Sequence, residues 1–335
     1  MSAMRAEALE APEAVAAALA QTREIADIAA QIRARAPRFV QLCARGSSAH
    51  AGTLLGHLIA RRLGLVAAEA MPSLASIYAA PQHLAGSLFI AISQSGASPD
   101  LIAAATQART DGALTLALTN TPNSPLAAAC ERHLPLAAGP ERSVAATKTV
   151  LATLALSIAL IDAWQATATP GLASLPDRIA RACRLDWTPL ITRLATCNRL
   201  LAIGRGPALG IAREAALKLA ETCNIAALAY SAAEFAHGPM ALLAPDVPLL
   251  AFVQHDAARR PTEALLSRLA PRGPILAAGA RLPAIQTLPT LSPSHPDTDV
   301  IPMLASLYLA TESAARARGL DPDHPASLQK ITRTT

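Results

Sequence analysis

Aromatic residues and basic runs are scarce in this 335-residue chain. Phe, Trp and Tyr together make up 3% of it, and the arginines behind its formal net charge of +5 are scattered. Proteins that bind nucleic acids combine a clustered basic surface with a recognisable binding motif. The sequence therefore argues against a nucleic-acid partner.

Disulfide and metal-binding patterns are also missing. The five cysteines are spread without CxxC spacing, and an odd, dispersed set is typical of reduced core thiols in a cytosol. A packing role is expected for Cys223. Glu234 and His237 form one ExxH pair, but there is no second such pair and no HExxH motif. We expect no metal site.

No apolar run is long enough to span a bilayer. The longest, around residues 151–161, contains Thr and Ser and stops at Asp162, whereas a spanning helix needs about 20 apolar residues. Residues 1–19 are charged early and predict one amphipathic helix, not a signal peptide. We therefore expect a cytoplasmic enzyme that does not contact a membrane.

The chain repeats one pattern of apolar runs. Two of these runs end in Arg-Gly at Gly46 and Gly206, and Gln94 and Gln254 each follow their glycine by 48 positions. A third apolar run follows each Gln, and Ala- and Leu-rich segments of helical length lie between the runs. Short apolar strands that alternate with helices predict parallel α/β sheets. The repeated spacing predicts two copies of one unit.

Two hydroxyl-rich turns stand at strand ends in the first copy. One is Gly46-Ser47-Ser48, and the other covers residues 93–98. Small hydroxyl residues with Gly let backbone amides approach an anion, and the following helix N-terminus adds a favourable dipole. One such turn would be explained as an ordinary helix cap, but two at equivalent strand ends predict a phosphate site.

A charged face is predicted on one helix of the second copy. Glu214, Lys218 and Glu221 are spaced four and three apart, so they share one helical face. Such pairs usually lie on a solvated surface, but the neighbours here are mostly Ala and Leu, and unpaired buried charge is costly. His237 follows in a turn-like His-Gly-Pro. Carboxylate, amine and imidazole are the groups that proton transfer on a carbonyl compound requires.

Six motifs resemble those of one known family: GSS at Gly46, SQSGASPD at Ser93, SVAATK at Ser143, EAALKLAE at Glu214, AEFAHGP at Ala233 and DPDHPASLQK at Asp321. From about residue 7 to 330 the sequence resembles the sugar isomerase (SIS) family. More narrowly, it is similar to the isomerase half of glucosamine-6-phosphate synthase and to SIS-type glucosamine-6-phosphate deaminases. The resemblance implies an α/β fold of two tandem flavodoxin-like SIS domains, each a parallel sheet flanked by helices.

The resemblance also implies domain boundaries and a phosphosugar site. We expect an N-terminal helical segment over residues 1–34, SIS domains over 35–165 and 186–318, and an active-site tail over 319–335. The positions that match the family's sugar-phosphate ligands are Ser48, Ser93, Gln94, Ser95 and Ser98. Val144 matches a position whose backbone touches the sugar.

The same resemblance implies the catalytic roles. Glu221 matches the base that moves a proton between C1 and C2, and Lys218 and Glu214 match residues near the C1 and C2 oxygens. His237 matches a ring-opening acid/base that reaches over from the neighbouring subunit, which implies a homodimer. Lys330 matches a lysine on the C-terminal loop that contacts the open-chain sugar and can form a Schiff base with the ketose.

Two motifs depart from the family pattern. Where the family motif usually reads SQSGET, this chain has Ala97 in place of the acidic residue and Ser98 in place of Thr. Ser98 keeps a hydroxyl, so we expect phosphate binding to survive. Where the family motif usually reads VAST, this chain has Ala146 in place of Ser. This change bears on sugar specificity and not on the reaction class.

The first expectation for activity is conversion of glucosamine 6-phosphate to fructose 6-phosphate and ammonia, because no glutaminase domain is visible in the sequence. No cofactor is expected, since the substrate carbonyl is itself the electron sink. The enzymatic alternatives are a synthase-like isomerase and aminotransferase served by a separate glutaminase, a fructosamine-phosphate deglycase and a galactosamine-phosphate deaminase. The non-enzymatic alternative is a phosphosugar-sensing module, which would not need Glu221, His237 and Lys330.

Overall fold

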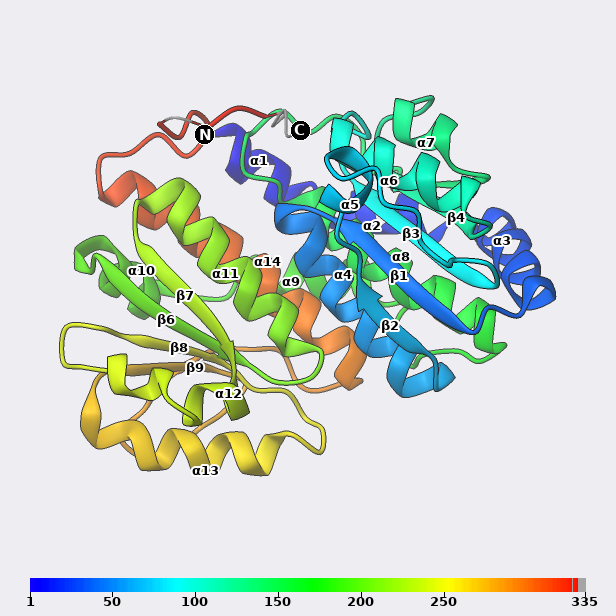
Figure 1. Ribbon diagram of the computed structural model, residues 1–335. Helices are drawn as coiled ribbons and strands as arrows, with labels where there is room; N and C mark the ends of the chain where they lie inside the picture. Colours follow the sequence, from blue (N-terminus) through cyan, green and yellow to red (C-terminus); the bar gives the residue numbers. More distant parts are fainter. Residues whose placement is uncertain (327, 331–335) are drawn as a thin grey trace. The chain divides into compact units, whose positions relative to one another are not determined.

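The computed structural model describes residues 1–326 and 328–330 (Figure 1). It divides into two compact units that are interleaved along the chain. The first unit holds residues 13–140, 152–169 and 329–330, and the second holds residues 1–12, 141–151, 170–326 and 328. The segments predicted at 1–34, 35–165 and 319–335 each contribute residues to both units, and the predicted domain boundaries stay predictions.

A parallel sheet of five strands forms the centre of the first unit, in the order β2-β1-β3-β4-β5. The central strands β3 and β4 are buried along their whole length, as continuous apolar runs are in parallel sheets. The strands are β1 (Phe39–Ala44), β2 (Val66–Glu69), β3 (Ser87–Ser93), β4 (Leu114–Thr119) and β5 (Arg132–Pro135).

Helices cover both faces of this sheet. On one face α4 packs so closely that a Cβ added to Gly56 would lie 3.0 Å from Leu42 Cδ1. On the other face Cys43 and Phe89 pack with side chains of α6 and α7. The helical elements that lie wholly or mostly in this unit are α2 (Ala11–Leu19), α3 (Thr22–Arg35), α4 (Gly46–Leu58), a π-helix η1 (Ile59–Leu63), α5 (Ser73–Ser76), α6 (Pro99–Thr110), α7 (Pro125–Ala129) and α8 (Lys148–Gln165).

The second unit has a matching parallel sheet, in the order β7-β6-β8-β9-β10. Strand by strand, this is the order of the first sheet, and both follow the flavodoxin-like pattern. The two-copy α/β prediction is therefore confirmed. The strands are β6 (Arg199–Gly204), β7 (Ala226–Ser231), β8 (Leu249–Phe252), β9 (Ile275–Ala278) and β10 (Gln286–Leu288).

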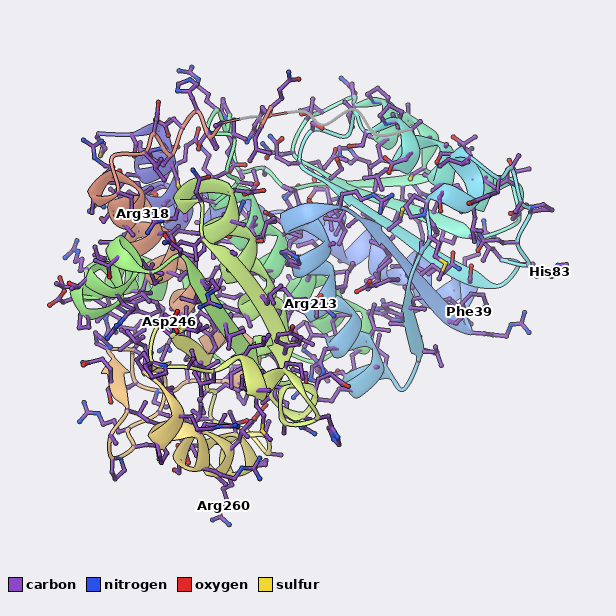
Figure 2. The ribbon with its side chains drawn as sticks, turned by 60° about the vertical axis from the view of Figure 1, so that its left-hand side comes forward. Phe39, His83, Arg213, Asp246, Arg260 and Arg318 are labelled. Atoms are coloured by element: carbon purple, nitrogen blue, oxygen red, sulfur yellow. The ribbon has the colours of Figure 1, made fainter. Side chains whose placement is uncertain are left out.

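The helices of the second unit hold the chemistry described below. Helix α11 contacts β6, β7 and α14, while Phe235 of α12 and Leu266 of α13 pack against the side chains of β6, β8 and β9. Arg318 (Figure 2) donates to the carbonyls of Leu194 and Cys197 at 2.9 and 2.8 Å, which fixes the end of α14. The helical elements are α1 (Ala3–Leu9), α9 (Leu175–Ala182), α10 (Thr188–Thr196), α11 (Ala208–Cys223), α12 (Ala232–Ala236), η2 (Pro239–Leu242), α13 (Arg259–Leu269), η3 (Ala270–Arg272) and α14 (Pro296–Ala317).

Two helical predictions need correction. Residues 1–19 form two helices, α1 and α2, that are interrupted at Glu10, because Pro12 lacks an N–H and its ring would clash with the preceding turn of a continuous helix. The apolar run at 151–161 belongs to the 18-residue helix α8, which is long and apolar enough to cross a membrane by length and composition alone. However, 78% of it is buried inside the protein, as a core helix is.

Candidate active site

The two serine turns of the first unit lie at the carboxyl ends of adjacent strands. Ala44 at the end of β1 pairs with Ile92 of β3, so the turn that begins at Gly46 emerges beside the turn that begins at Ser93. The chain order reverses between these two strands, and in sheets of this kind ligands bind at that switch point. Helix α4 begins at Gly46, so Gly46-Ser47-Ser48 is the first turn of that helix, and α6 begins at Pro99, directly after the second turn. The two helix N-termini add dipoles that favour an anion.

An ion pair links the residues that flank the two turns, with Arg45 before the first and Asp100 after the second. Arg45 Nε and Nη2 lie 3.0 and 2.9 Å from Asp100 Oδ2, and the Asp100 side chain is fully buried. Gly96 in the second turn has a φ of +62°, and a Cβ there would meet Ser124 Oγ at 2.2 Å. Only glycine fits that position without strain. The turns are therefore held in a fixed shape.

The hydroxyls of the second turn partly serve the turn itself. Ser93 Oγ accepts from the Gly96 N–H at 3.1 Å, and Ser95 Oγ accepts from the Ala97 N–H at 3.3 Å. Ser98 occupies the N-cap position of α6, but among the described residues its hydroxyl accepts no capping hydrogen bond. Ser48 lies in the first turn of α4, and Ser48, Gln94, Ser95 and Ser98 are all half-buried. The helix-cap explanation therefore fails for Ser98, and its phosphate role stays a prediction.

The predicted charged face exists on α11 of the second unit. Lys218 Nζ contacts Glu221 Oε2 and lies 3.8 Å from Glu214 Oε1. The Lys218 and Glu214 side chains are each 1% exposed, whereas the Glu221 side chain is 23% exposed. The sequence interpretation of a charged face on a buried helix is thus confirmed. Of the two carboxylates on this face, only that of Glu221 is reached by solvent.

A buried tyrosine completes this cluster, and the sequence did not point to it. The Tyr308 hydroxyl on α14 donates to Glu214 Oε1 at 3.0 Å. Burial and the neighbouring Glu214 raise the pKa of Tyr308 well above its usual value, so the phenol stays a donor. Burial alone lowers the pKa of Lys218, but Glu214 and Glu221 outweigh that effect and the pKa is raised. Lys218 is therefore a cation at neutral pH.

Removing the Lys218 charge is expected to destabilise the fold. In Lys218→Met the buried Glu214 carboxylate loses the charge of Lys218, and breaking a buried ion pair costs about 3–5 kcal/mol. Urea unfolding should therefore show a loss of that size in the free energy of unfolding. Tyr308→Phe, which removes one hydrogen bond from the same carboxylate, should cost about 1–3 kcal/mol. A Lys218→Met protein as stable as wild type would show that the pair does not hold the buried charge.

The other predicted site residues lie in different settings. Val144 is half-buried in a loop before α8, and this loop belongs to the second unit. His237 is exposed at the end of α12, where its N–H donates to the Glu234 carbonyl at 3.0 Å. Lys330 is half-buried in a bend and belongs to the first unit, which also holds the serine turns.

In the described part of the chain, neither a metal site nor a nucleophilic role for Cys223 is indicated. No group of three or more His, Cys, Asp or Glu side chains that could hold a metal occurs there. Cys223 is fully buried, and its Sγ lies 3.5 Å from the Thr311 carbonyl. Burial raises the pKa of this thiol to about 11, so the reactive thiolate is rare at neutral pH. The packing role predicted for Cys223 is supported.

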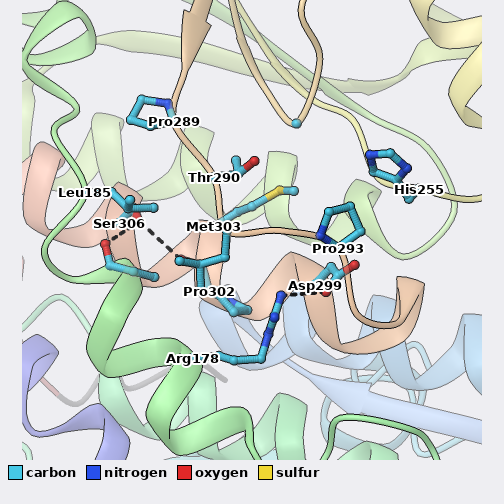
Figure 3. Close-up of a pocket in the computed structure, with 13 residues that line it drawn as sticks. Arg178, Leu185, His255, Pro289, Thr290, Pro293, Asp299, Pro302, Met303 and Ser306 are labelled. Atoms are coloured by element: carbon cyan, nitrogen blue, oxygen red, sulfur yellow. Dashed lines mark hydrogen bonds and ion pairs between the residues drawn. The ribbon is translucent and has the colours of Figure 1, made fainter.

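A small cavity lies at the carboxyl ends of β8, β9 and β10 (Figure 3). Its volume is about 50 Å³, enough for a few water molecules and too small for a sugar phosphate. Arg178 and Asp299, which pair at 2.9 Å, form part of its wall. None of the predicted site residues is among the described residues that line it.

Known proteins are similar to this chain in sequence. The SIS domain model matches residues 35–163 and 193–278. The chain belongs to the SIS domain family. A glutamine–fructose-6-phosphate aminotransferase (isomerizing) from Symbiobacterium thermophilum is 35% identical over 346 residues, which cover 94% of this chain and 54% of that protein. The chain thus spans about half the length of that curated relative.

Solved structures of SIS proteins share the fold. A Silicibacter pomeroyi protein assigned as a phosphosugar isomerase is 38% identical, with a TM-score of 0.91 over 96% of this chain and 100% of that one. Glucosamine-6-phosphate deaminase from Thermotoga maritima has a TM-score of 0.76 over 97% of this chain and 100% of that one. At 17% identity, the second likeness concerns the SIS fold alone.

Proposed function

We propose that the protein is an amino-sugar phosphate deaminase and isomerase that converts glucosamine 6-phosphate and water to fructose 6-phosphate and ammonia. The observation that carries the proposal is the Glu221 carboxylate, which solvent reaches and which contacts a buried lysine cation. A base that must stay ionised and still meet a substrate requires this combination. A phosphosugar sensor has no use for it.

The serine turns would supply the phosphate site of the proposed reaction. The hydroxyls of Ser48, Ser93, Ser95 and Ser98, with Gln94 beside them, would hold the sugar phosphate at the N-termini of α4 and α6. Two helix dipoles and several N–H groups are suited to a dianion. Phosphate binding would hold the sugar in place during the reaction, which lowers the entropic part of the barrier.

The chemistry would then proceed in three steps. His237 opens the pyranose ring to the free aldehyde. Glu221 takes the proton from C2 and returns it at C1, through an enolamine whose oxygen Lys218 stabilises and which Glu214 and Lys330 help to position. Water then adds to the resulting C2 imine, and ammonia leaves to give the ketose. The substrate carbonyl accepts the electron pair in the proton transfer, so these steps need no redox partner.

The test of this proposal is ammonia release from a panel of amino-sugar 6-phosphates by the purified protein without glutamine. Glucosamine 6-phosphate should release ammonia and form fructose 6-phosphate in equal amounts, while galactosamine 6-phosphate and fructosamine 6-phosphate should react more slowly. Activity confined to a fructosamine phosphate would replace deamination with deglycation. No ammonia from any of the panel would refute the proposal.

Sharing of His237 between subunits predicts complementation. Glu221→Gln and His237→Asn proteins should each be nearly inactive, whereas their mixture should recover about a quarter of wild-type turnover. Random exchange makes half of the dimers mixed, and a two-fold dimer that shares residues regains one of its two sites. Native mass spectrometry should follow the exchange. Mixed dimers without recovered activity would place His237 in the site of its own chain.

The 35% identical aminotransferase favours one second candidate, synthesis of glucosamine 6-phosphate from fructose 6-phosphate. The same groups would run the steps in reverse, with ammonia supplied by a separate glutaminase. Coupled assays with fructose 6-phosphate and ammonium should reveal this direction. A rate of synthesis far above the rate of deamination at equal substrate concentrations would favour the second candidate.

A further inference from the structure

Helix α1 is tied to the loop that carries Val144. The Glu7 side chain, in a residue that is 5% exposed, accepts hydrogen bonds from the backbone N–H groups of Arg142 and Ser143, the latter at 3.2 Å. These two residues directly precede Val144. Hydrogen bonds to an ionised carboxylate are roughly twice as strong as neutral ones. The start of the SVAATK segment is therefore fixed to α1, across 135 positions of sequence.

Carboxylates hold the far end of the same segment. Glu10, directly after α1, contacts Lys148 Nζ at 2.5 Å, and the Lys148 side chain is 3% exposed. Glu141 accepts from the N–H groups of Thr147 and Thr149 at 3.0 and 3.1 Å. The loop around Val144 is thus held at both ends although it contains no helix or strand.

The beginning of α1 is tied to the C-terminal tail. The Asp323 carboxylate accepts from the N–H groups of Ala3 and Met4, each at 2.7 Å. These are orphan donors of a helix N-terminus, where a negative charge is favourable. Asp323 lies seven positions before Lys330 in the sequence. Ser2 donates to Glu312 of α14 at 2.7 Å, so α1 itself rests on the core of the second unit.

We propose that α1 positions both the Val144 backbone and the start of the tail that leads to Lys330, through the carboxylates of Glu7, Glu10 and Asp323. We call α1 and these three carboxylates the bracket. Glu7 and Asp323 are then positioning residues, because each acts through the backbone that it holds. Their effect on turnover rests on the proposed function, but the tethering does not. The proposal makes one specific prediction. Weakening the hydrogen bonds at either end of α1 must also increase the mobility of the segment that is held at the other end.

Hydrogen exchange read by mass spectrometry tests that prediction. Full-length wild type, Glu7→Gln and Asp323→Asn are compared, with Glu13→Gln, an exposed carboxylate in the first turn of α2, as the matched control. Both bracket variants should speed exchange of the amides at 142–149 by about tenfold or more, because the free energy of one hydrogen bond to a charged group corresponds to a factor of that size. Glu7→Gln should also speed exchange at 3–9 and 320–326. Amides of β8 and the control protein should be unchanged.

The kinetic arm separates positioning from general destabilisation. Glu7→Gln should raise KM for glucosamine 6-phosphate about tenfold with little change in kcat, because it disturbs a sugar contact. Asp323→Asn should mainly lower kcat, because it disturbs the approach to Lys330. Exchange that rises only beside the altered residue, or rises uniformly with a falling Tm, would overturn the bracket. A wild-type protein that releases no ammonia would refute the proposed function instead, and the exchange comparison would still judge the bracket.

Discussion

Glu221→Gln is expected to lower kcat for ammonia release by about 10²–10⁴-fold, the usual contribution of general acid–base catalysis. The amide keeps the size of the side chain but cannot take the C2 proton. The variant should still fold, because Lys218 keeps Glu214 as a counter-ion 3.8 Å away. KM for glucosamine 6-phosphate should change little, since the phosphate contacts are untouched. Steady-state assays with coupled detection of ammonia measure both constants.

The control for this variant is Glu13→Gln, which removes the same charge from an exposed position on α2. It should keep wild-type kcat and KM. Thermal unfolding of both variants should show that the loss at Glu221 is not a loss of fold. Turnover of Glu221→Gln within a few-fold of wild type would remove Glu221 from the role of the base.

Ser93→Ala with Ser95→Ala is expected to raise KM for the sugar phosphate by about two orders of magnitude or more, because a hydrogen bond to a charged group contributes about 1.5–3 kcal/mol. The effect on kcat should be much smaller, which is the pattern of lost ground-state binding. Inorganic phosphate should inhibit the wild type competitively and the double variant far less. Initial rates over a range of substrate and phosphate concentrations give both results.

Ser267→Ala, which removes an exposed hydroxyl from α13, is the matched control and should leave KM unchanged. The double variant also removes the acceptors for the N–H groups of Gly96 and Ala97, so its Tm must be compared with that of the wild type. An unchanged KM in a folded double variant would exclude this turn from the phosphate site.

The fold could be predicted where the chain is apolar and repetitive. The matched spacing from Gly46 to Gln94 and from Gly206 to Gln254 corresponds to equivalent strands, β1 and β3 in one sheet and β6 and β8 in the other. The edge strands β2, β5, β7 and β10 were not predicted. Each of them has at most one buried residue, so none shows the fully buried apolar run of a central strand.

The candidate site was predictable to the extent that it is local in sequence. Spacing alone placed Glu214, Lys218 and Glu221 on one face, because helical geometry fixes such neighbours. Tyr308 contacts Glu214 across 94 positions, and no periodicity relates residues that far apart. Asp100 stood within a quoted motif, but its role as partner of Arg45 depends on how two strand ends meet. Such contacts follow from the tertiary fold and not from any local pattern.

The most direct test of the central claim is the proton NMR spectrum of the product formed from glucosamine 6-phosphate in D₂O without glutamine. A base that carries the C2 proton to C1 should yield fructose 6-phosphate, one ammonia per ketose, and hydrogen at C1 that is partly retained from C2 and partly exchanged with solvent. Glu221→Gln should form neither product at a comparable rate. An unchanged glucosamine 6-phosphate spectrum with the wild type, with no ammonia and no exchange at C2, would contradict the account.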